Sequence, residues 1–242
     1  MYQMFQSRFA EIYDLLMRSR AKDYDTESAQ VERVVRARNP NASSLLDVAC
    51  GTGLHLRSFA ERFDRAVGFD QSKDMLSVAQ GHIAGLETRS GDMRHFDLGE
   101  TFDVITCMFA VPLLQSVAEL ESMISCFLRH LNPNGVLVIE PWHNPEQFIP
   151  GYISSDLITD GPRKVYRVSH SMHHPDGKDR VHMVVHYVDT DPESGMQYLT
   201  ETCDMTLFTR EHYEATFAKV GCVAEHVQLQ PFERGLWVAQ RA

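Results

Sequence analysis

The segment LLDVACGTGLHL, residues 45–56, constrains the fold more than any other part of the sequence. Its first five residues are apolar apart from Asp47, which is typical of a buried strand. Two glycines follow, and apolar residues then recur at helical spacing as far as residue 63. The glycines therefore lie where a strand passes into the N-terminus of a helix, and a turn of this kind commonly binds a ligand.

The alternation of strands and helices continues to residue 140. We expect strands at 45–49, 66–70, 86–90, 102–108 and 136–140, and helices at 55–63, 73–83 and 117–131. The segment NPNG, residues 132–135, is interpreted as the turn between the last helix and its strand. Alternation of this kind predicts an α/β fold with a doubly wound, mostly parallel sheet that carries helices on both faces.

The N-terminal segment has an amphipathic pattern. One helical face carries Phe5, Phe9, Ile12, Tyr13 and Leu16. A second helix is expected at residues 24–38. We therefore interpret residues 1–40 as a helical lid that packs across the sheet or closes over the mouth of a site.

The pattern changes again after residue 160. Residues 161–208 alternate polar with apolar side chains in three stretches, separated by HPDGKD and DPESG, which predicts an inserted antiparallel β-meander. A capped helix at 209–219 and a strand pair at 222–229 and 235–240 follow. The whole chain, residues 1–242, is interpreted as a single domain.

Composition limits the classes of function. The hydrophobic share of 43% suffices for a core, and no apolar run approaches the roughly 18 residues that a membrane span needs. A formal net charge of −10 makes attraction to a phosphate backbone unfavourable, so we expect a small-molecule partner, with neither nucleic acid nor membrane. The five cysteines include no CxxC pair, which favours a reducing, cytoplasmic location over a disulfide framework.

The glycine turn favours an adenosine-type ligand without phosphates. A dinucleotide site needs GxGxxG, and Leu56 replaces the third glycine, which makes a dehydrogenase the weaker hypothesis. Asp70 ends the second strand, where a carboxylate can accept both ribose hydroxyls. Asp92 follows the third strand and can accept the adenine amino group. Asp47 needs a hydrogen bond if it is buried, and it can serve simply to order the turn.

Several segments resemble a known family. LLDVACGTG, GFDQS, GDMRHF and FDVITCMFA, within residues 44–140, resemble the successive motifs of class I S-adenosylmethionine-dependent methyltransferases. FAEIYD, KDY, EPWHNPEQFIPGY, RVSHS, TLF and RGLWV resemble the N,N-dimethyltransferases of nucleotide-linked aminodeoxy sugars in antibiotic pathways. The resemblance implies a Rossmann-like, seven-stranded sheet, S-adenosyl-L-methionine as cofactor and S-adenosyl-L-homocysteine as product. It also implies that residues 161–208 form part of the acceptor site.

The cofactor site is expected to combine the turn, the strand ends and the N-terminal helices. The candidate residues are Tyr13, Tyr24, Ala49, Gly51, Thr52, Gly53, Asp70, Gln71, Met75, Asp92, Met93, Met108 and Phe109. By resemblance, Tyr13 and Tyr24 reach the cofactor or the acceptor amine, and core packing is the alternative for both. Ala49 stands where the family usually has the first glycine of its GxGxG motif.

Methyl transfer to an amine requires that the nitrogen lose its proton, because a primary sugar amine is mostly protonated at neutral pH. The candidate catalytic residues are Tyr13, Glu140 and His143. MFAV, at 108–111, replaces the (N/D)PP(Y/F) turn of enzymes that methylate planar amide-like nitrogens, which favours an aliphatic amine or an oxygen. AVPLLQS, at 110–116, lacks the histidine that the sugar N-methyltransferases carry there. Gln115 in it is expected to face solvent, with a polar contact as the alternative.

Two other sets of residues concern the acceptor and metals. By resemblance Tyr152, Ser169 and Arg234, and by charge Arg167, are expected to bind a nucleotide diphosphate, whereas Arg163 and Lys164 are interpreted as loop charges. Five histidines cluster in the meander: His170, His173, His174, His182 and His186. No carboxylate shares a short spacing with them, so no metal site is expected.

Three hypotheses remain open at this point. The first is methyl transfer to the amino group of a small nucleotide-linked aminodeoxy sugar. The second is an O- or N-methyltransferase of another small secondary metabolite, prompted by the altered segment 110–116. The third is a non-catalytic S-adenosylmethionine-binding sensor or scaffold. A homodimer is also left open.

Overall fold

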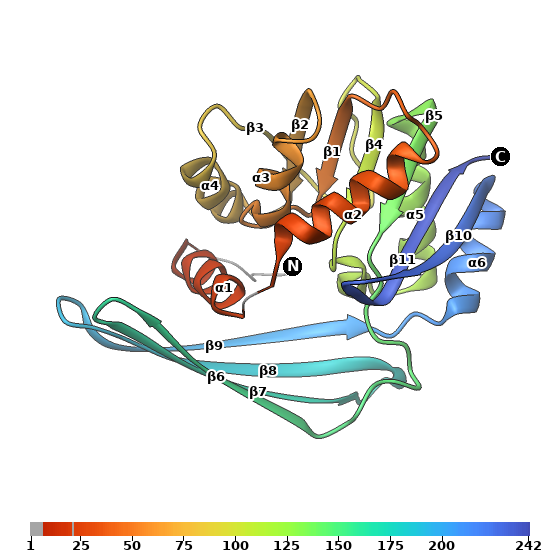
Figure 1. Cartoon of the computed structure of the whole chain (residues 1–242). Coiled ribbons are helices and arrows are strands. Elements are labelled where there is room, and N and C mark those ends of the chain that lie inside the picture. The colour runs from red at the N-terminus through yellow and green to blue at the C-terminus, as the bar shows by residue number, and fades with distance from the viewer. Residues whose placement is uncertain (1–6, 21) are drawn as a thin grey trace.

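The computed structural model describes residues 7–20 and 22–242, so Phe5 of the expected lid lies outside the described residues. The chain forms two sheets with the first helix between them (Figure 1). The helices are α1 Ser7–Ser19, α2 Tyr24–Arg36, α3 Leu54–Ala60, α4 Lys73–His82, η1 Val111–Leu113 (a 3-10 turn), α5 Val117–Arg129 and α6 Arg210–Lys219. Within the described ranges, no helix has the length and apolar character that crossing a bilayer requires.

The larger sheet has the predicted doubly wound, seven-stranded architecture. Its strands are β1 Ser44–Val48, β2 Arg65–Asp70, β3 Glu87–Ser90, β4 Phe102–Cys107, β5 Leu131–Ile139, β10 Cys222–Leu229 and β11 Phe232–Arg241. The order across the sheet is β10-β11-β5-β4-β1-β2-β3, and pairing is parallel from β5 to β3. β11 is antiparallel to both β5 and β10. The strand order reverses between β1 and β4, and open α/β sheets bind ligands at such a point.

Helices cover both faces of this sheet because its central strands, β1, β4 and β5, are buried on both sides. On one face, α2 and α3 bury Val31 and Phe59 against Leu45 and its neighbours. On the other, α5 and α6 bury Phe127 and Phe217. The predicted cap of α6 is confirmed, since the Thr209 hydroxyl accepts the His212 N–H and the His212 ring accepts the Thr209 N–H.

The prediction of a turn at residues 132–135 was wrong. These residues belong to β5, which begins at Leu131. Leu131 pairs with Phe102 of β4, but the next paired position is Val136 with Val104, so the four residues form an irregular bulge in the strand. The turn-forming residues of NPNG thus lie inside a strand instead of before it.

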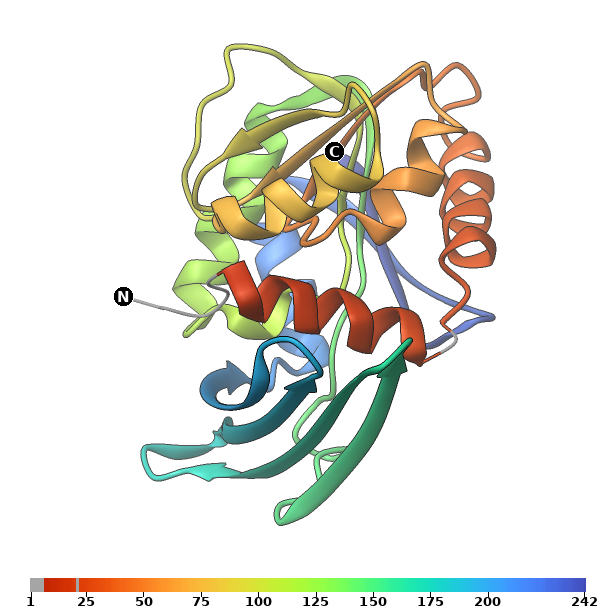
Figure 2. The same ribbon diagram turned by 90° about the vertical axis from the view of Figure 1, so that its left-hand side faces the viewer.

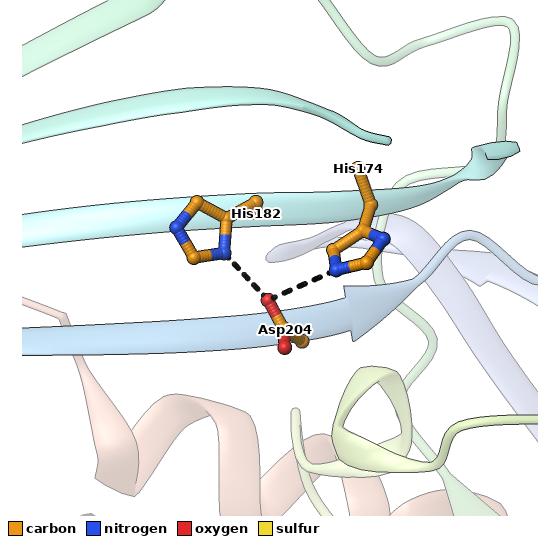
Figure 3. A group of neighbouring side chains, drawn as sticks. All are labelled: His174, His182 and Asp204. Carbon is orange, nitrogen blue, oxygen red and sulfur yellow. Dashed lines mark hydrogen bonds and ion pairs between the residues drawn. The ribbon is translucent and has the colours of Figure 1, made fainter. Parts of the chain in front are cut away.

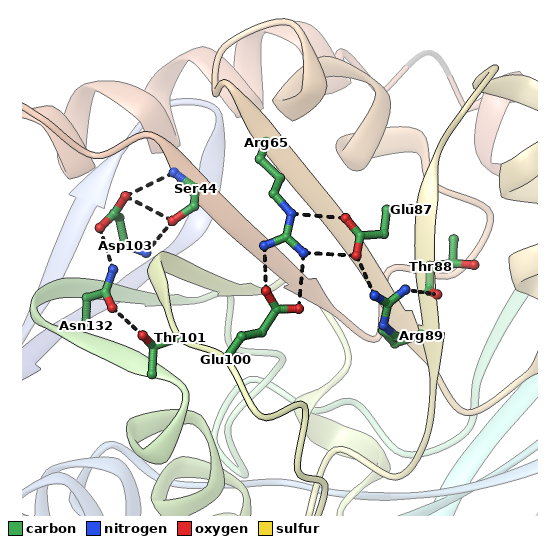
Figure 4. Close-up of polar contacts among 9 residues, drawn as sticks. All are labelled: Ser44, Arg65, Glu87, Thr88, Arg89, Glu100, Thr101, Asp103 and Asn132. Atoms are coloured by element: carbon green, nitrogen blue, oxygen red, sulfur yellow. Dashed lines mark hydrogen bonds and ion pairs between the residues drawn. The ribbon is translucent and has the colours of Figure 1, made fainter.

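An ion-pair network closes the edge of the sheet at the amino ends of the parallel strands (Figure 4). Arg65 donates bidentately to Glu87, at 2.9 and 3.0 Å, and also to both carboxylate oxygens of Glu100. Asp103 accepts the backbone N–H groups of Ser43 and Ser44, and these bonds, with one from Asn132, lower the pKa of its carboxyl to about 2 although burial opposes them. The ion pairs and hydrogen bonds at this edge therefore join neighbouring strands of the sheet.

The smaller sheet is antiparallel and has four strands in the order β6-β7-β8-β9. The strands are β6 Tyr152–Asp160, β7 Arg163–His174, β8 Gly177–Asp191 and β9 Gly195–Thr206. The last three correspond to the stretches expected within 161–208, and β6 precedes that range. Sequence patterning missed β6 because Ile158 is its only buried apolar residue and most of its other side chains are exposed.

Helix α1 lies across the inner face of the smaller sheet (Figure 2). Phe9, Ile12 and Leu16 pack against an apolar cluster that includes Val165 and Tyr187. Arg8 adds a hydrogen bond of 2.9 Å to Asp189, a fully buried carboxylate on β8. The contacts of α1 with α4 on its other side join the two sheets.

Candidate active site

A cavity of about 760 Å³ opens at the carboxyl ends of β1, β2 and β4. Ten of the predicted cofactor residues line it: Tyr13, Ala49, Gly51, Asp70, Gln71, Met75, Asp92, Met93, Met108 and Phe109. Three predicted residues, Tyr24, Thr52 and Gly53, are not among the lining residues. Gly53 instead caps the N-terminus of α3 with φ of +79°, and Thr52 is buried beneath the turn. The sequence therefore predicted most of the lining residues correctly, but it also included residues that are not part of the cavity wall.

The glycine turn is held in a left-handed backbone conformation. Ala49 has φ of +58° and Gly51 has φ of +56°. Such a conformation is strained for alanine and unstrained for glycine, which is the physical reason that a glycine is the usual residue at position 49 of this motif. A Cβ on Gly51 would meet the ring of Tyr13 at 4.0 Å. That distance is ordinary van der Waals contact, so the positive φ, and not crowding by Tyr13, favours glycine at position 51.

Asp70 joins the turn to the end of β2. One carboxylate oxygen accepts the Gly51 N–H at 2.9 Å, and the other accepts the Ser72 N–H at 2.8 Å. Burial raises the pKa of this carboxyl, and backbone hydrogen bonds from Ser72, Gly51 and Gln71 oppose that rise. A carboxylate has about four acceptor positions, so capacity remains to accept from a ribose.

Asp92 is also partly occupied. Its Oδ1 accepts both the backbone N–H and the Nε of Arg94 at 2.9 Å, and its Oδ2 accepts from the same guanidinium. These guanidinium bonds lower the pKa of the carboxyl. Arg94 reaches on to Glu119 of α5 and itself lines the cavity. Sequence reasoning missed Arg94, although it stands in the GDMRHF motif two residues after Asp92.

Asp47 supports the turn from below. It is buried, and its Oδ1 accepts the hydroxyl of Thr106, its partner across the β1–β4 ladder, at 2.7 Å. Burial raises the pKa of Asp47 to about 7. The hydrogen bond that the sequence required of this residue is therefore present.

Tyr13 and Tyr24 have different surroundings. Tyr13 lines the cavity, and burial raises the pKa of its hydroxyl to about 12, so the phenol remains neutral at physiological pH. Tyr24, at the start of α2, packs edge-on against His55 with ring centroids 4.7 Å apart. Burial also raises the pKa of the Tyr24 hydroxyl. Both rings therefore present neutral hydroxyl groups.

Glu140, directly after β5, is a buried acid that is not among the residues lining the cavity. Its backbone N–H donates to Cys107 of β4 at 3.0 Å, and the described residues offer its Oε2 no hydrogen-bond donor. The Nζ of Lys22 lies 3.8 Å from that oxygen and 3.0 Å from Glu27. Burial raises the pKa of Glu140 to about 7, although the charge of Lys22 works against the rise. Glu140 is thus poised to exchange a proton near neutral pH.

A second group joins Phe109, His143 and Arg234. Phe109 has φ of +62°, a strained conformation for a bulky residue, and its ring lines the cavity. Lys22 Nζ and Arg234 Cζ lie 5.7 and 5.8 Å from its centroid. Arg234 donates to the Nε2 of His143 at 2.9 Å, so that nitrogen carries no proton. Burial and the charge of Arg234 lower the pKa of His143.

The remaining acceptor candidates lie on the smaller sheet. Arg167 and Ser169 are buried on the side of β7 that faces the body of the protein, and Arg167 donates to Asp156 at 3.0 Å. Tyr152, the first residue of β6, is 58% exposed. None of these three is among the residues that line the cavity described here.

The expectation that Gln115 faces solvent was wrong. Gln115 lines the cavity, and its Nε2 donates to the carbonyl oxygens of Leu113 and Asp204. Its Oε1 accepts from Arg180 of β8. The local pattern before α5 predicted a solvent-facing residue because the partners on β8 and β9 are distant in the chain.

Comparison with known proteins identifies the cofactor and the class of reaction. A family described as a methyltransferase domain matches residues 45–135. The chain is 40% identical to the Streptomyces fradiae dTDP-3-amino-3,6-dideoxy-alpha-D-glucopyranose N,N-dimethyltransferase, over 96% of this chain and 91% of that protein. It is 39% identical to the Streptomyces venezuelae dTDP-3-amino-3,4,6-trideoxy-alpha-D-glucopyranose N,N-dimethyltransferase, over 97% and 98% of the two chains.

Solved structures agree over the whole chain, including the smaller sheet. Streptomyces venezuelae DesVI superposes with a TM-score of 0.90 at 39% identity, covering 98% of this chain and 100% of that chain. SAM-bound CalS10, an amino pentose methyltransferase from Micromonospora echinaspora, superposes with a TM-score of 0.84 at 40% identity, covering 100% and 99%. Membership in a family of enzymes argues against a non-catalytic sensor. The chain belongs to the class I S-adenosylmethionine-dependent methyltransferases and, within them, to the family of the nucleotide-sugar N,N-dimethyltransferases.

Proposed function

We propose that this methyltransferase acts on the amino group of a small nucleotide-linked aminodeoxy sugar. The observation that carries the proposal is the near-full-length similarity to enzymes named for such substrates, which extends beyond the cofactor domain into the smaller sheet. The test is a radiolabelled methyl-transfer assay with a panel of aminodeoxy sugar nucleotides, free amino sugars and hydroxylated aglycones. Turnover confined to free sugars or aglycones would refute the proposal.

The lining residues fit S-adenosyl-L-methionine. In the proposed complex, Asp70 accepts from the ribose, and Asp92 accepts the adenine amino group in exchange for one of its bonds from Arg94. Met108 and Phe109 hold the methionine portion, and the Phe109 face favours a positive charge. When bound, the cofactor supplies an electrophilic methyl group on a sulfonium. The protein must then present a neutral amine in line with that group.

Glu140 is the proposed proton acceptor for the amine. Its pKa of about 7 leaves a substantial ionised fraction at neutral pH, and the described residues give its buried Oε2 no hydrogen-bond partner. Lys22, 3.8 Å away, stabilises the ionised form and connects it through Glu27 to His55, whose Nε2 lies 2.6 Å from Glu27. Tyr13 is proposed to orient the amine through its neutral hydroxyl.

His143 is proposed to act with Arg234 instead of alone. Since its Nε2 already accepts from Arg234, it is not available as a base until that bond is released. Arg234 would then turn toward the diphosphate of the acceptor, as a guanidinium binds phosphate oxygens bidentately. Tyr152, Arg167 and Ser169 are the further proposed diphosphate contacts.

A second candidate acceptor is a different small amine or a hydroxyl group. The observation in its favour is η1, Val111–Leu113, which puts apolar side chains where the related enzymes are expected to have a histidine. The same substrate panel separates the two hypotheses, because nuclear magnetic resonance of the product identifies whether nitrogen or oxygen was methylated and how many methyl groups were added.

The proposed assembly is a homodimer through the outer face of the smaller sheet. Register places Ile153, Leu157, Tyr166 and Val168 on this face, and each side chain is at least 47% exposed. An exposed apolar face of this kind commonly marks a protein interface. Light scattering that reports a dimer for the natural chain, and a monomer for Tyr166→Glu, would support this assembly, whereas a monomeric natural chain would refute it.

A further inference from the structure

Three potential metal ligands meet on the smaller sheet, and none of them lines the methyl-transfer cavity (Figure 3). They are His174 of β7, His182 of β8 and Asp204 of β9. One ligand atom from each lies within 4.8 Å of the others. His182 Nδ1 is 2.6 Å, and His174 Nε2 is 3.9 Å, from Asp204 Oδ1.

Strand register explains why these side chains converge. His182 and Asp204 are direct partners across the β8–β9 ladder, so their side chains lie on the same face. The ladder between β7 and β8 is irregular between His173 and His174, which brings His174 beside His182, with ring centroids 6.1 Å apart. The side chains are 18 to 40% exposed, so an ion can reach them from solvent.

We propose that His174, His182 and Asp204 form a binding site for a divalent transition-metal ion of the zinc type. Two imidazoles and one carboxylate suit such an ion and leave a fourth position for water. At ion–ligand distances of about 2.1 Å, tetrahedral ligands lie roughly 3.4 Å apart. The observed separations of 2.6 and 3.9 Å fall on either side of that value, so small side-chain rotations complete the geometry.

A further carboxylate completes the surroundings of His174. In the ion-free protein, His174 Nδ1 accepts the Asp176 N–H at 3.1 Å. Binding of an ion at Nε2 requires the ring proton to move to Nδ1, where Asp176 Oδ2, 3.3 Å away, can accept it. A carboxylate that receives the second ring N–H is the usual companion of a metal-bound histidine, because it fixes the tautomer and ring orientation.

The site is linked to the wall of the methyl-transfer cavity. The carbonyl oxygen of Asp204 accepts from Gln115, a cavity-lining residue, at 3.2 Å. Arg180 also donates to Gln115 and lies 3.7 Å from Asp176. A bound ion would therefore tie three strands together beside the cavity, and its first expected effect is on the stability of the smaller sheet.

The test uses untagged, metal-stripped full-length protein with Co²⁺ and Zn²⁺ as probes. For the natural chain we expect one Co²⁺ per chain, visible absorption bands of low-symmetry Co²⁺, and a rise in Tm with Zn²⁺. His182→Gln and Asp204→Asn are each expected to weaken Co²⁺ binding by at least about tenfold. Removal of a residue that merely hydrogen-bonds to a metal ligand already lowers metal affinity by that much, and removal of a ligand should lower it at least as much. His170→Gln, an exposed histidine of the same sheet outside the cluster, is the matched control and should bind normally.

Circular dichroism of each variant separates loss of the site from loss of fold. Absence of Co²⁺ bands in the natural chain would overturn the proposal. Equal Co²⁺ affinity in the natural chain, His182→Gln and Asp204→Asn would also overturn it, because the ion would then be bound elsewhere. These readouts do not depend on methyl transfer, so they are independent of the proposed acceptor.

Discussion

Replacement of Glu140 by glutamine should raise the stability of the protein at neutral pH relative to acidic pH, and should lower its activity. Burial shifts the pKa of Glu140 from its ordinary 4.5 to about 7, so the folded state holds this proton more tightly than the unfolded state between those pH values. At about 1.4 kcal/mol per pKa unit, the natural chain should lose about 3 kcal/mol of unfolding free energy as the pH rises through this window. Glutamine does not titrate, so Glu140→Gln should lack this loss.

The stability measurement is urea denaturation of both proteins at several pH values from 4 to 8. The difference between the two unfolding free energies should move by about 3 kcal/mol in favour of the variant as the pH rises, whatever the packing of the amide costs at one pH. Parallel stability curves across this range would show that Glu140 titrates normally, and the reasoning from burial would fail.

The activity measurement is the pH profile of kcat for the same pair. The natural chain should gain activity through a pH of about 7, as Glu140 ionises. The variant should lose that inflection and about 100-fold in kcat at neutral pH, a typical contribution of a general base. High pH should restore part of the variant's rate, because the substrate amine then deprotonates in solution. An unchanged inflection near pH 7 in the variant would place the base elsewhere.

Three further predictions concern the turn, the ribose contact and the opposite edge of the sheet. Ala49→Gly should stabilise the protein by about 0.5–1 kcal/mol in urea denaturation, because relief of roughly 1–2 kcal/mol of left-handed strain exceeds the added freedom of glycine in the unfolded chain. Asp70→Ala should weaken S-adenosylhomocysteine binding in calorimetry at least about tenfold, since hydrogen bonds to a charged group contribute roughly 1.5–3 kcal/mol; unchanged affinity would contradict the ribose assignment. Asp103→Ala should lower the free energy of unfolding by about 1–2 kcal/mol at pH 7, after allowance for solvent screening. Because the ionised form of Asp103 makes the stabilising bonds, the difference between the two proteins should disappear as the pH falls from about 4 through about 2.

Local patterns predicted the elements that repeat regularly and failed where a residue's environment is set by distant segments. The parallel strands and their helices were predicted within a few residues because their apolar periodicity is strong. Strand β6 was missed because it buries one apolar side chain, and Gln115 was misplaced because its partners lie on β8 and β9. The residue types in NPNG indicated a turn, but pairing with β4 incorporates them into β5.

By itself, the sequence determined that a strand, a glycine turn and a helix follow one another, and that acids stand at the ends of the next two strands. These features depend on neighbours within a few residues, so they survive in a linear pattern. Only the tertiary structure decided that Lys22 lies beside Glu140, that Arg234 donates a hydrogen bond to His143, and that Asp204 lies between two histidines. Those contacts depend on sheet register and burial, which no spacing along the chain encodes.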